Sequence, residues 1–317
     1  VRFGDEVVRV EARMRADDAE ERTIAAAFER RRKRKKVTIN AAEPERIGEA
    51  IGGVGAVIFS PSDVEIVAGS PSGRRRFLDI VLSLAVPGYL GALQRFRQVL
   101  HQRNALLRQG AAPAMVAAWN EGLVAWGSRV VAARAAWVRE SAAGFAEHYA
   151  RVAGGPRGVL AYDPSTGEVE GAEDPREVAA AFRAELERVA EREARRGMTL
   201  VGPHRDDLRF EMERGGEAPL DLRTYGSGGQ QRTAAVALRM VEAETIRATR
   251  GRDTVILLDD VFAELDPGRS RRILEWIEGV EGAQVILTSP KPSDVEIRGG
   301  ALPRWEMRGG RVLAGPL

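Results

Sequence analysis

The 317-residue sequence contains no cysteine. This absence excludes disulfide bonds, thiolate metal ligands and cysteine nucleophiles, and it agrees with a reducing, cytoplasmic environment. The sequence also has no run of about 18 apolar residues, the length that a membrane-spanning helix needs, and no signal-peptide pattern. We therefore expect no association with a membrane.

The sequence has little net charge, because 48 Lys and Arg residues nearly balance 46 Asp and Glu residues. The cations are nevertheless clustered: Arg30 to Lys36 are seven consecutive basic residues, and Arg74 to Arg76 form a second run. Clustered cations are typical of nucleic-acid contacts, although a solvated hairpin is the simpler interpretation of the first run. For the second run, a role inside the fold or near a nucleotide ranks before DNA contact.

The first part of the chain has the periodicity of strands. Apolar and charged residues alternate from Val8 to Met14, which predicts a strand with one buried face. Further strands are predicted at Thr23 to Phe28, Val37 to Asn40 and Ala56 to Phe59. Length and composition predict two domains rather than one.

The middle of the chain has helical periodicity, in three segments separated by glycine and proline. The apolar stripes of these segments are Leu93, Phe96, Leu100 and Leu107, then Trp119, Leu123, Trp126, Val130, Ala133 and Trp137, then Val178, Phe182, Leu186 and Val189. The second stripe has the spacing of a long helix that packs against a partner helix, so we expect its tryptophans in the core. We predict a helical lobe at residues 87–196, between residues 1–86 and residues 197–317.

The last part of the chain predicts an α/β unit. A hairpin turn is predicted at Gly215-Gly216, and a helix follows from about Gln231 to Thr249. A strand at Val255 to Asp259, a helix near Arg269 to Ile277 and a strand at Gln284 to Thr288 complete the pattern. This order predicts parallel strands in an α/β sheet.

Four aliphatic residues, Val255 to Leu258, end in the carboxylates Asp259 and Asp260. A parallel strand buried on both faces is continuously apolar, and a carboxylate at its C-terminal end faces the ligand crevice of the sheet. In nucleotide hydrolases such a carboxylate holds Mg²⁺ through water, and the next one can polarise the attacking water. Taken alone, the segment fits equally well a buried strand that stops at a polar turn.

Two more motifs flank this strand. Tyr225 to Gln231 opens the long helix with a serine and glycines, which can offer a hydroxyl and backbone N–H groups to a phosphate. A glycine turn that only caps the helix is the alternative. Ala263 to Asp266 follows the carboxylate pair. Together, in this order and spacing, the three motifs rarely arise by chance.

These segments resemble the ATP-binding cassette (ABC) ATPases. Ser227, Gly229 and Gln230 resemble the signature motif of these proteins. Asp259 and Asp260 resemble their Walker B pair, and Glu264, Leu265 and Asp266 resemble their D-loop. Within this group the chain resembles the RecF family, on segments 61–79, 101–104, 202–207 and 257–274. The resemblance extends from residue 1 to about residue 289.

The resemblance implies an α/β fold: an ABC-type ATPase head with a mixed or parallel sheet, formed by residues 1–86 and 197–317, and an inserted helical lobe, or short coiled-coil arm, at residues 87–196. It implies a slow ATPase that forms an ATP-dependent homodimer and binds single- and double-stranded DNA. It further implies action with RecO- and RecR-type mediators in loading recombinase at single-strand gaps, within DNA repair, replication and the SOS response.

The resemblance also implies roles for individual residues. Asp259 would hold Mg²⁺ and Asp260 would be the catalytic carboxylate. Ser227, Gly229 and Gln230 would contact the nucleotide of a partner subunit across the dimer interface, where Glu264 and Asp266 would also lie. Thr288 occupies the position where transporters carry a switch histidine. The candidate DNA contacts are Arg30, Arg32, Arg34 and Lys36.

The sequence departs from this family in one respect. ATP binding in this fold uses the P-loop, G-x-x-x-x-G-K-[ST], and the nearest segment, Gly69 to Arg74, lacks both the lysine and the spacing. In the family the P-loop lies ahead of the region where this sequence starts, at Val1. We therefore expect a truncation, and a polypeptide that retains the half of an ABC site that acts in trans and lacks the half that acts in cis.

Other functions remain open on the sequence. A transporter ATPase subunit would carry a histidine at position 288 and a shorter insertion than the one between Ser70 and Ser227. A chromosome-structural protein would need a much longer coiled-coil arm. A DNA- or mediator-binding module that uses no nucleotide fits the missing P-loop.

The three histidines are too scattered along the sequence to predict a metal site. The segment His204 to Asp207 is predicted to be a packed polar turn near the site, without an assigned chemistry.

Overall fold

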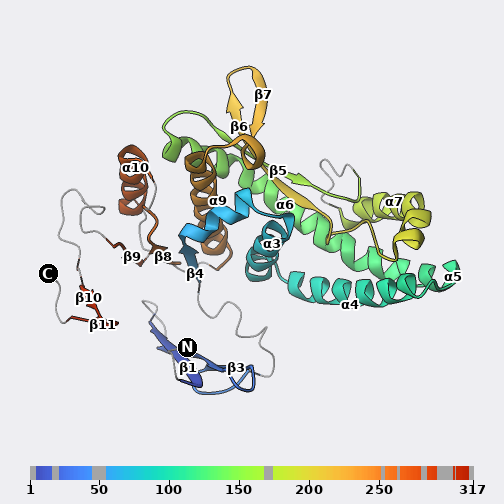
Figure 1. The fold of residues 1–317 in the computed structure, drawn as a ribbon, viewed down its shortest axis with the longest axis horizontal. Coiled ribbons are helices and arrows are strands. Elements are labelled where there is room, and N and C mark those ends of the chain that lie inside the picture. The colour runs from blue at the N-terminus through green and yellow to red at the C-terminus, as the bar shows by residue number, and fades with distance from the viewer. Residues whose placement is uncertain are drawn as a thin grey trace.

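The computed structural model describes residues 5–15, 21–44, 55–167, 174–250, 254–262, 265–279, 284–290, 303 and 305–313 (Figure 1). The strands are β1 (Val7–Met14), β2 (Arg22–Glu29), β3 (Arg34–Ile39), β4 (Ala56–Phe59), β5 (Gly158–Asp163), β6 (Asp207–Arg214), β7 (Glu217–Asp221), β8 (Val255–Asp259), β9 (Val285–Thr288), β10 (Met307–Arg308) and β11 (Arg311–Val312). The helices are η1 (Pro61–Asp63), α2 (Val64–Ala68), α3 (Pro71–Ala85), α4 (Tyr89–Arg108), α5 (Pro113–Ala117), α6 (Asn120–Ala153), α7 (Pro175–Arg196), α8 (Leu222–Tyr225), α9 (Gly228–Arg250) and α10 (Pro267–Glu278).

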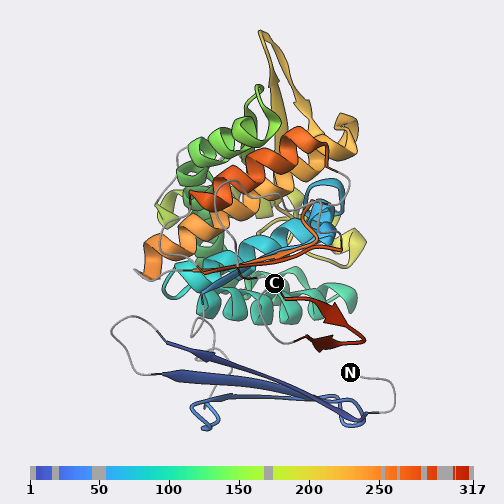
Figure 2. The ribbon, with the colours of Figure 1, turned by 90° about the vertical axis from the view of Figure 1, so that its left-hand side faces the viewer.

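The first three strands form an antiparallel sheet in the order β1-β2-β3, which lies at the bottom of Figures 1 and 2. The strand predictions for this region are confirmed, but the buried face predicted for the first strand is wrong. Val10 is 65% exposed and most of β1 is exposed with it. Alternation decides which side chains share a face of a strand, whereas burial requires a second layer against that face.

A parallel sheet in the order β4-β8-β9 carries the candidate site. The β-α-β unit predicted from the sequence is confirmed, with α10 between β8 and β9. One face of the sheet packs against helices through residues such as Val57, Phe59 and Ile256. On the other face Ile58 and Ile286 are 52% and 48% exposed.

The three predicted helices are α4, α6 and α7, and they form the lobe on the right of Figure 1. Helix α6 ends at Gly154, which adopts a left-handed conformation with φ of 79°. Such a C-terminal glycine has no Cβ to strain the turn. Trp137 lies in the core, but Trp119 is 36% exposed, so the prediction that all tryptophans of this stripe are buried is wrong. Trp119 precedes the helix rather than lying within its apolar face.

A third sheet, in the order β5-β6-β7, joins the lobe to the C-terminal part of the chain. Strand β5 falls inside the segment predicted to be helical, because its apolar run Val159 to Tyr162 has no alternation, and periodicity alone cannot distinguish such a run from part of a buried helix. Phe145 of α6, Leu160 of β5 and Leu238 of α9 belong to one hydrophobic core. The division of the chain at residues 86 and 196 stays a prediction. Among the described helices, none has the length and apolar character to cross a membrane.

Candidate nucleotide site and the polar clusters that support it

Two carboxylates stand at one edge of the parallel sheet. Strands β8 and β9 run in the same direction, and Asp259 pairs with Thr288 at their C-terminal ends. The Thr288 hydroxyl donates to Oδ1 of Asp259 at 2.7 Å, and the backbone N–H of Asp260 donates to the Thr288 carbonyl at 3.2 Å. The side chain at the predicted switch position therefore holds the predicted metal-binding carboxylate.

The geometry at Asp259 fits a hydrated cation. Its carboxylate is exposed at the sheet edge, while Thr288 fixes one of its oxygens. Mg²⁺ prefers oxygen ligands and keeps several of its waters, so it needs only one or two carboxylates from the protein. Asp260 follows with φ of 48°, a left-handed conformation that non-glycine residues adopt mainly at turns. The chain therefore turns sharply at the second carboxylate.

The turn after β4 reaches the same edge, because β4 is parallel to β8. Asp63 accepts from the backbone N–H of Ser60 at 2.8 Å and pairs with Arg239 of α9 at 2.6 Å. Arg239 also pairs with Glu242 at 2.6 Å. Burial raises the pKa of Glu242, and Arg239 acts in the opposite direction. This triad, in which Asp63 and Glu242 are buried, fixes the turn after β4 to the long helix of the signature motif.

The predicted signature turn caps that helix. The Ser227 N–H donates to Oε1 of Gln230 at 2.8 Å, and the Gln230 N–H donates to the Ser227 hydroxyl at 3.2 Å. This reciprocal pair is a capping box, which satisfies two backbone donors at the helix start. The same residues therefore fit both interpretations of the turn, contact with a phosphate and capping of the helix. Tyr225, just before it, is 72% exposed.

The signature turn meets the predicted D-loop through a residue to which the sequence assigned no contact, Arg269. Asp266 caps α10 by accepting from the backbone N–H of Arg269 at 3.0 Å, and it pairs with the Arg269 guanidinium at 3.2 Å. That guanidinium lies on Gly229: a Cβ at Gly229 would be 2.4 Å from Nη1 of Arg269. Glu264, the other residue predicted for this interface, lies outside the described residues.

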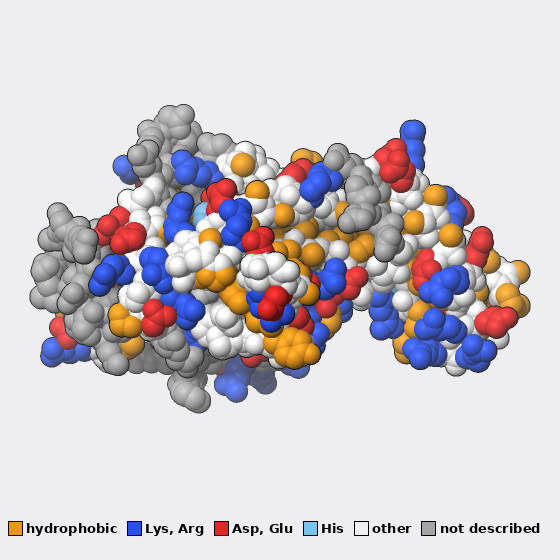
Figure 3. Space-filling model, turned by 90° about the horizontal axis from the view of Figure 1, so that it is seen from above, with side chains coloured by type: hydrophobic (Ala, Val, Ile, Leu, Met, Phe, Trp, Pro, Cys, Tyr) orange, Lys and Arg blue, Asp and Glu red, His pale blue; other side chains and the backbone are white. Residues whose placement is uncertain are grey.

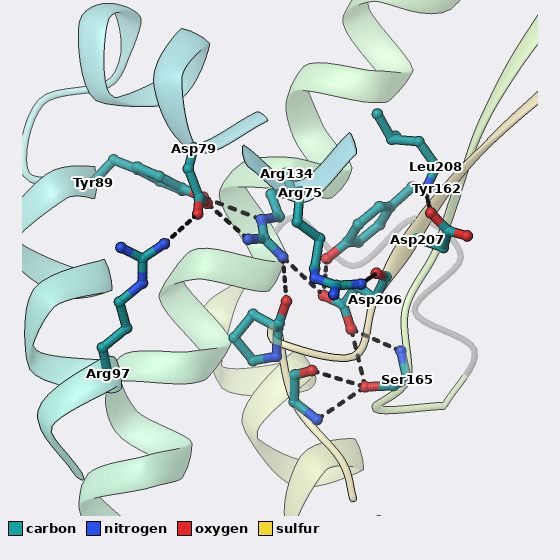
Figure 4. Close-up of polar contacts among 12 residues, drawn as sticks. Arg75, Asp79, Tyr89, Arg97, Arg134, Tyr162, Ser165, Asp206, Asp207 and Leu208 are labelled. Atoms are coloured by element: carbon teal, nitrogen blue, oxygen red, sulfur yellow. Dashed lines mark hydrogen bonds and ion pairs between the residues drawn. The ribbon is translucent and has the colours of Figure 1, made fainter. Parts of the chain in front are cut away.

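The packing of the polar turn predicted at His204 to Asp207 is confirmed (Figure 4), while its place near the nucleotide site stays a prediction. Asp206 is fully buried and accepts from the backbone N–H and the hydroxyl of Ser165, at 2.9 and 3.0 Å, and from the Tyr162 hydroxyl. The Arg75 guanidinium donates to the Asp206 carbonyl at 2.8 Å.

Arg74 and Arg134 hold the elements around this cluster together. Arg74 is buried in α3 and binds Asp207 through two hydrogen bonds of 2.6 and 2.9 Å. Arg134 of α6 donates to Asp79 at 2.7 Å and to the Pro203 carbonyl at 2.6 Å (Figure 4). Two of the three cations in the second basic run therefore act inside the fold, as one of the sequence interpretations expected, while Arg76 is exposed.

Another buried ion pair lies in the lobe. Arg103 of α4 donates to Glu193 of α7 at 2.6 Å and to the Thr199 hydroxyl at 2.8 Å. Asn104 accepts from the Thr199 backbone N–H at 2.7 Å. Arg103 and Asn104 are half of segment 101–104, one of the segments that resemble the RecF family. Their contacts give this part of the segment a structural role.

The first basic run forms the hairpin between β2 and β3, and all seven of its residues are exposed. Residues 30–33 form the turn, and strand alternation applies only from Arg34 to Lys36. Arg32 lies 3.6 Å from Glu29, and Lys36 pairs with Glu43. Figure 3 shows that Lys and Arg side chains also gather at the far end of the lobe, near α7, whose last turns expose Arg188, Arg192, Arg195 and Arg196.

Known proteins are similar to this chain in sequence. Residues 136–293 match the family described as "AAA domain, putative AbiEii toxin, Type IV TA system". The chain is 38% identical over 268 residues to the DNA replication and repair protein RecF of Symbiobacterium thermophilum, covering 84% of this chain and 69% of the relative. It is 38% identical over 265 residues to the protein of that name from Clavibacter sepedonicus, covering 76% and 63%.

Solved structures agree. The chain superposes with a TM-score of 0.81 and 27% identity on a structure described as the recombination mediator protein RecF-ATP in the RecFOR pathway, covering 99% of this chain and 82% of the other. An Smc head bound to the C-winged helix domain of ScpA matches with a TM-score of 0.50 and 13% identity, which shows a shared fold only. The fold is that of an ABC-type ATPase head, and the chain belongs to the RecF family of DNA replication and repair proteins.

Proposed function

We propose that this chain acts in recombinational DNA repair and replication-gap processing as part of an ATP-dependent DNA-binding ATPase. The observation that carries the proposal is the joint arrangement of three motifs: the carboxylate edge at Asp259, the exposed turn at Ser227, and α10, which is capped by Asp266 and contacts that turn. The similarity to RecF proteins supports it.

Within this proposal the residues divide into two groups. Asp259 would hold Mg²⁺ through water, and Asp260 would orient or polarise the attacking water; the ion would neutralise charge on the phosphates of ATP. Ser227, Gly229 and Gln230 would meet the nucleotide bound by a second subunit. An exposed helix start with a hydroxyl and free backbone N–H groups suits a phosphate.

The sequence contains no P-loop, so we propose that this polypeptide by itself does not bind ATP well. It would instead supply the signature half of a site to an intact subunit. Tight binding of ATP–Mg²⁺ at micromolar concentration by this polypeptide alone would contradict this proposal.

The test is to mix the chain with an intact RecF subunit that carries a P-loop and to measure ATP hydrolysis. We expect the chain to stimulate hydrolysis. Ser227→Arg should abolish the stimulation, because it blocks the signature turn. Asp260→Asn should leave it intact, because the carboxylate serves only the chain's own, incomplete site. Equal loss in both variants would refute action in trans.

We further propose that the hairpin cations Arg30, Arg32, Arg34 and Lys36 contact the phosphate backbone of single- or double-stranded DNA. They are exposed members of a run of seven consecutive cations, and Arg34 and Lys36 share one face of β3. Charge reversal at Arg32 and Arg34 should weaken DNA binding and flatten its salt dependence, since each phosphate contact releases counterions. The matched control reverses Arg188 and Arg192 on α7; an effect only in the control would move the DNA site to the lobe.

The remaining parts of the proposal come from the family. They are an ATP-dependent homodimer and action with RecO- and RecR-type mediators to load recombinase on single-stranded DNA. Co-sedimentation of the chain with such mediators, with and without gapped DNA, tests this part separately from nucleotide chemistry.

A further inference from the structure

Helix α10 contacts both the signature turn and the end of the lobe helix α6. In Figures 1 and 2, α10 lies beside α9 and the C-terminal end of α6. Its apolar side packs against the parallel sheet, where Trp276 contacts Phe59 with ring centroids 5.9 Å apart. The helix is therefore fixed to the sheet that carries Asp259, and its remaining surface is available to other elements.

Two arginines of α10 each place their guanidinium group directly against a glycine of another element. The Arg269 guanidinium lies on Gly229 of the signature turn, where a Cβ would come within 2.4 Å of it. The Arg272 guanidinium lies on Gly154 at the end of α6, where a Cβ would be 3.0 Å from its Cζ. Residues three apart share one helix face, so a single face of α10 reaches both neighbours.

Hydrogen bonds accompany these close approaches. Arg272 donates to the carbonyls of Val152 and Ala153, at 2.9 and 3.3 Å, which are among the last carbonyls of α6. These carbonyls have no partner within their own helix, so Arg272 acts as its C-terminal cap. Arg269 pairs with Asp266 and acts electrostatically on Tyr149 of α6, whose pKa burial raises to about 12 and the Arg269 cation lowers.

We propose that Arg269 and Arg272 are positioning residues that make α10 a rigid link between the signature turn and the helical lobe. A nucleotide that displaces the signature turn would then also move the end of α6. In the same way, a partner that binds the lobe and moves α6 would displace the signature turn. Reciprocity follows because a coupling free energy between two sites acts equally in both directions. The role of this link in ATP hydrolysis rests on the proposed function. The mechanical link between the signature turn and α6 does not depend on it.

Hydrogen exchange of the complete chain tests the link. The reporters are backbone amides at each end: Gln231, which donates to Ser227 at 2.9 Å, and Gly154, which donates to Ala150 at 2.8 Å. We expect Arg269→Ala and Arg272→Ala each to raise exchange about tenfold at both reporters, since each removes contacts worth roughly one net hydrogen bond or more. Arg271→Ala, on the exposed side of the same helix, should change neither.

The link is overturned if each variant raises exchange only at its own end. Gly229→Ala offers a second, milder perturbation: its added Cβ displaces the Arg269 guanidinium and should raise exchange at Gly154. In an Arg269→Ala background, Gly229→Ala should have no further effect there. An effect that persists without Arg269 would refute its role.

A functional readout separates positioning from local stability. Arg272 donates its hydrogen bonds to α6, yet Arg272→Ala should reduce the stimulation of ATP hydrolysis by an intact subunit at least threefold, with Arg272→Lys restoring part of it. Unchanged stimulation would overturn the positioning role. If the unmodified chain gives no stimulation, the proposed function fails, and the exchange experiment still decides the link.

Discussion

Replacement of Arg103 by methionine should destabilise the lobe strongly. The Arg103 side chain is 3% exposed and that of Glu193 is 1% exposed. Arg103 donates to Glu193, to Thr199 and to Asn120, at 2.6, 2.8 and 2.9 Å. Breaking a buried ion pair by removing one partner costs about 3–5 kcal/mol, because the other charge stays buried and unpaired. That loss is a large part of a typical domain stability of about 5–15 kcal/mol.

Urea unfolding followed by circular dichroism measures this cost, with Arg108→Met as the control. Arg108 lies on the same helix but is exposed, so its replacement should cost less than about 0.5 kcal/mol. The double variant Arg103→Met/Glu193→Leu should lose at least about 1 kcal/mol less than the two single variants together, since it leaves no unpaired charge. Additive losses, or a loss below about 1 kcal/mol for Arg103→Met, would show that the pair is not buried as described.

Three further predictions concern single side chains. Burial lowers the pKa of His204 to about 4, so between pH 6.5 and 4 the unfolded chain binds a proton that the folded chain does not. Stability should therefore fall by up to about 3 kcal/mol as the pH decreases through this window, and thermal unfolding of His204→Gln should lack this dependence; an unchanged pH profile would contradict the assignment. The Tyr149 hydroxyl is buried without a partner among the described residues, so Tyr149→Phe should raise stability by about 1 kcal/mol in calorimetry, and a loss of that size would mean that the hydroxyl is hydrogen bonded. Ser227→Ala should cost about 1 kcal/mol by removing a helix cap; Ser227→Asp should restore stability but not stimulation in trans, and recovery of both would leave Ser227 with a capping role only.

The sequence by itself determined the elements whose pattern is local. Four aliphatic residues before Asp259 predict a buried parallel strand, and the 4-3 spacing from Leu123 to Trp137 predicts the long helix α6. Glycines that end helices or open turns, such as Gly154, can also be predicted from the sequence, because a left-handed backbone favours a residue without a Cβ. The order of these local signals was enough to identify the family.

The tertiary structure decided what each local feature contacts. Burial of β1 could not be predicted, since a strand pattern does not say whether a second layer covers it. Arg74 and Arg76 are two residues apart in one basic run, yet one is buried against Asp207, 133 residues away, and the other is exposed.

The same holds for the candidate site. The sequence placed Ser227, Asp259, Asp266 and Thr288 in motifs, but not the hydrogen bond between Thr288 and Asp259. It also did not place Arg269 on Gly229. Such contacts join elements far apart in the chain, and they depend on how helices and sheets pack, which no local periodicity encodes.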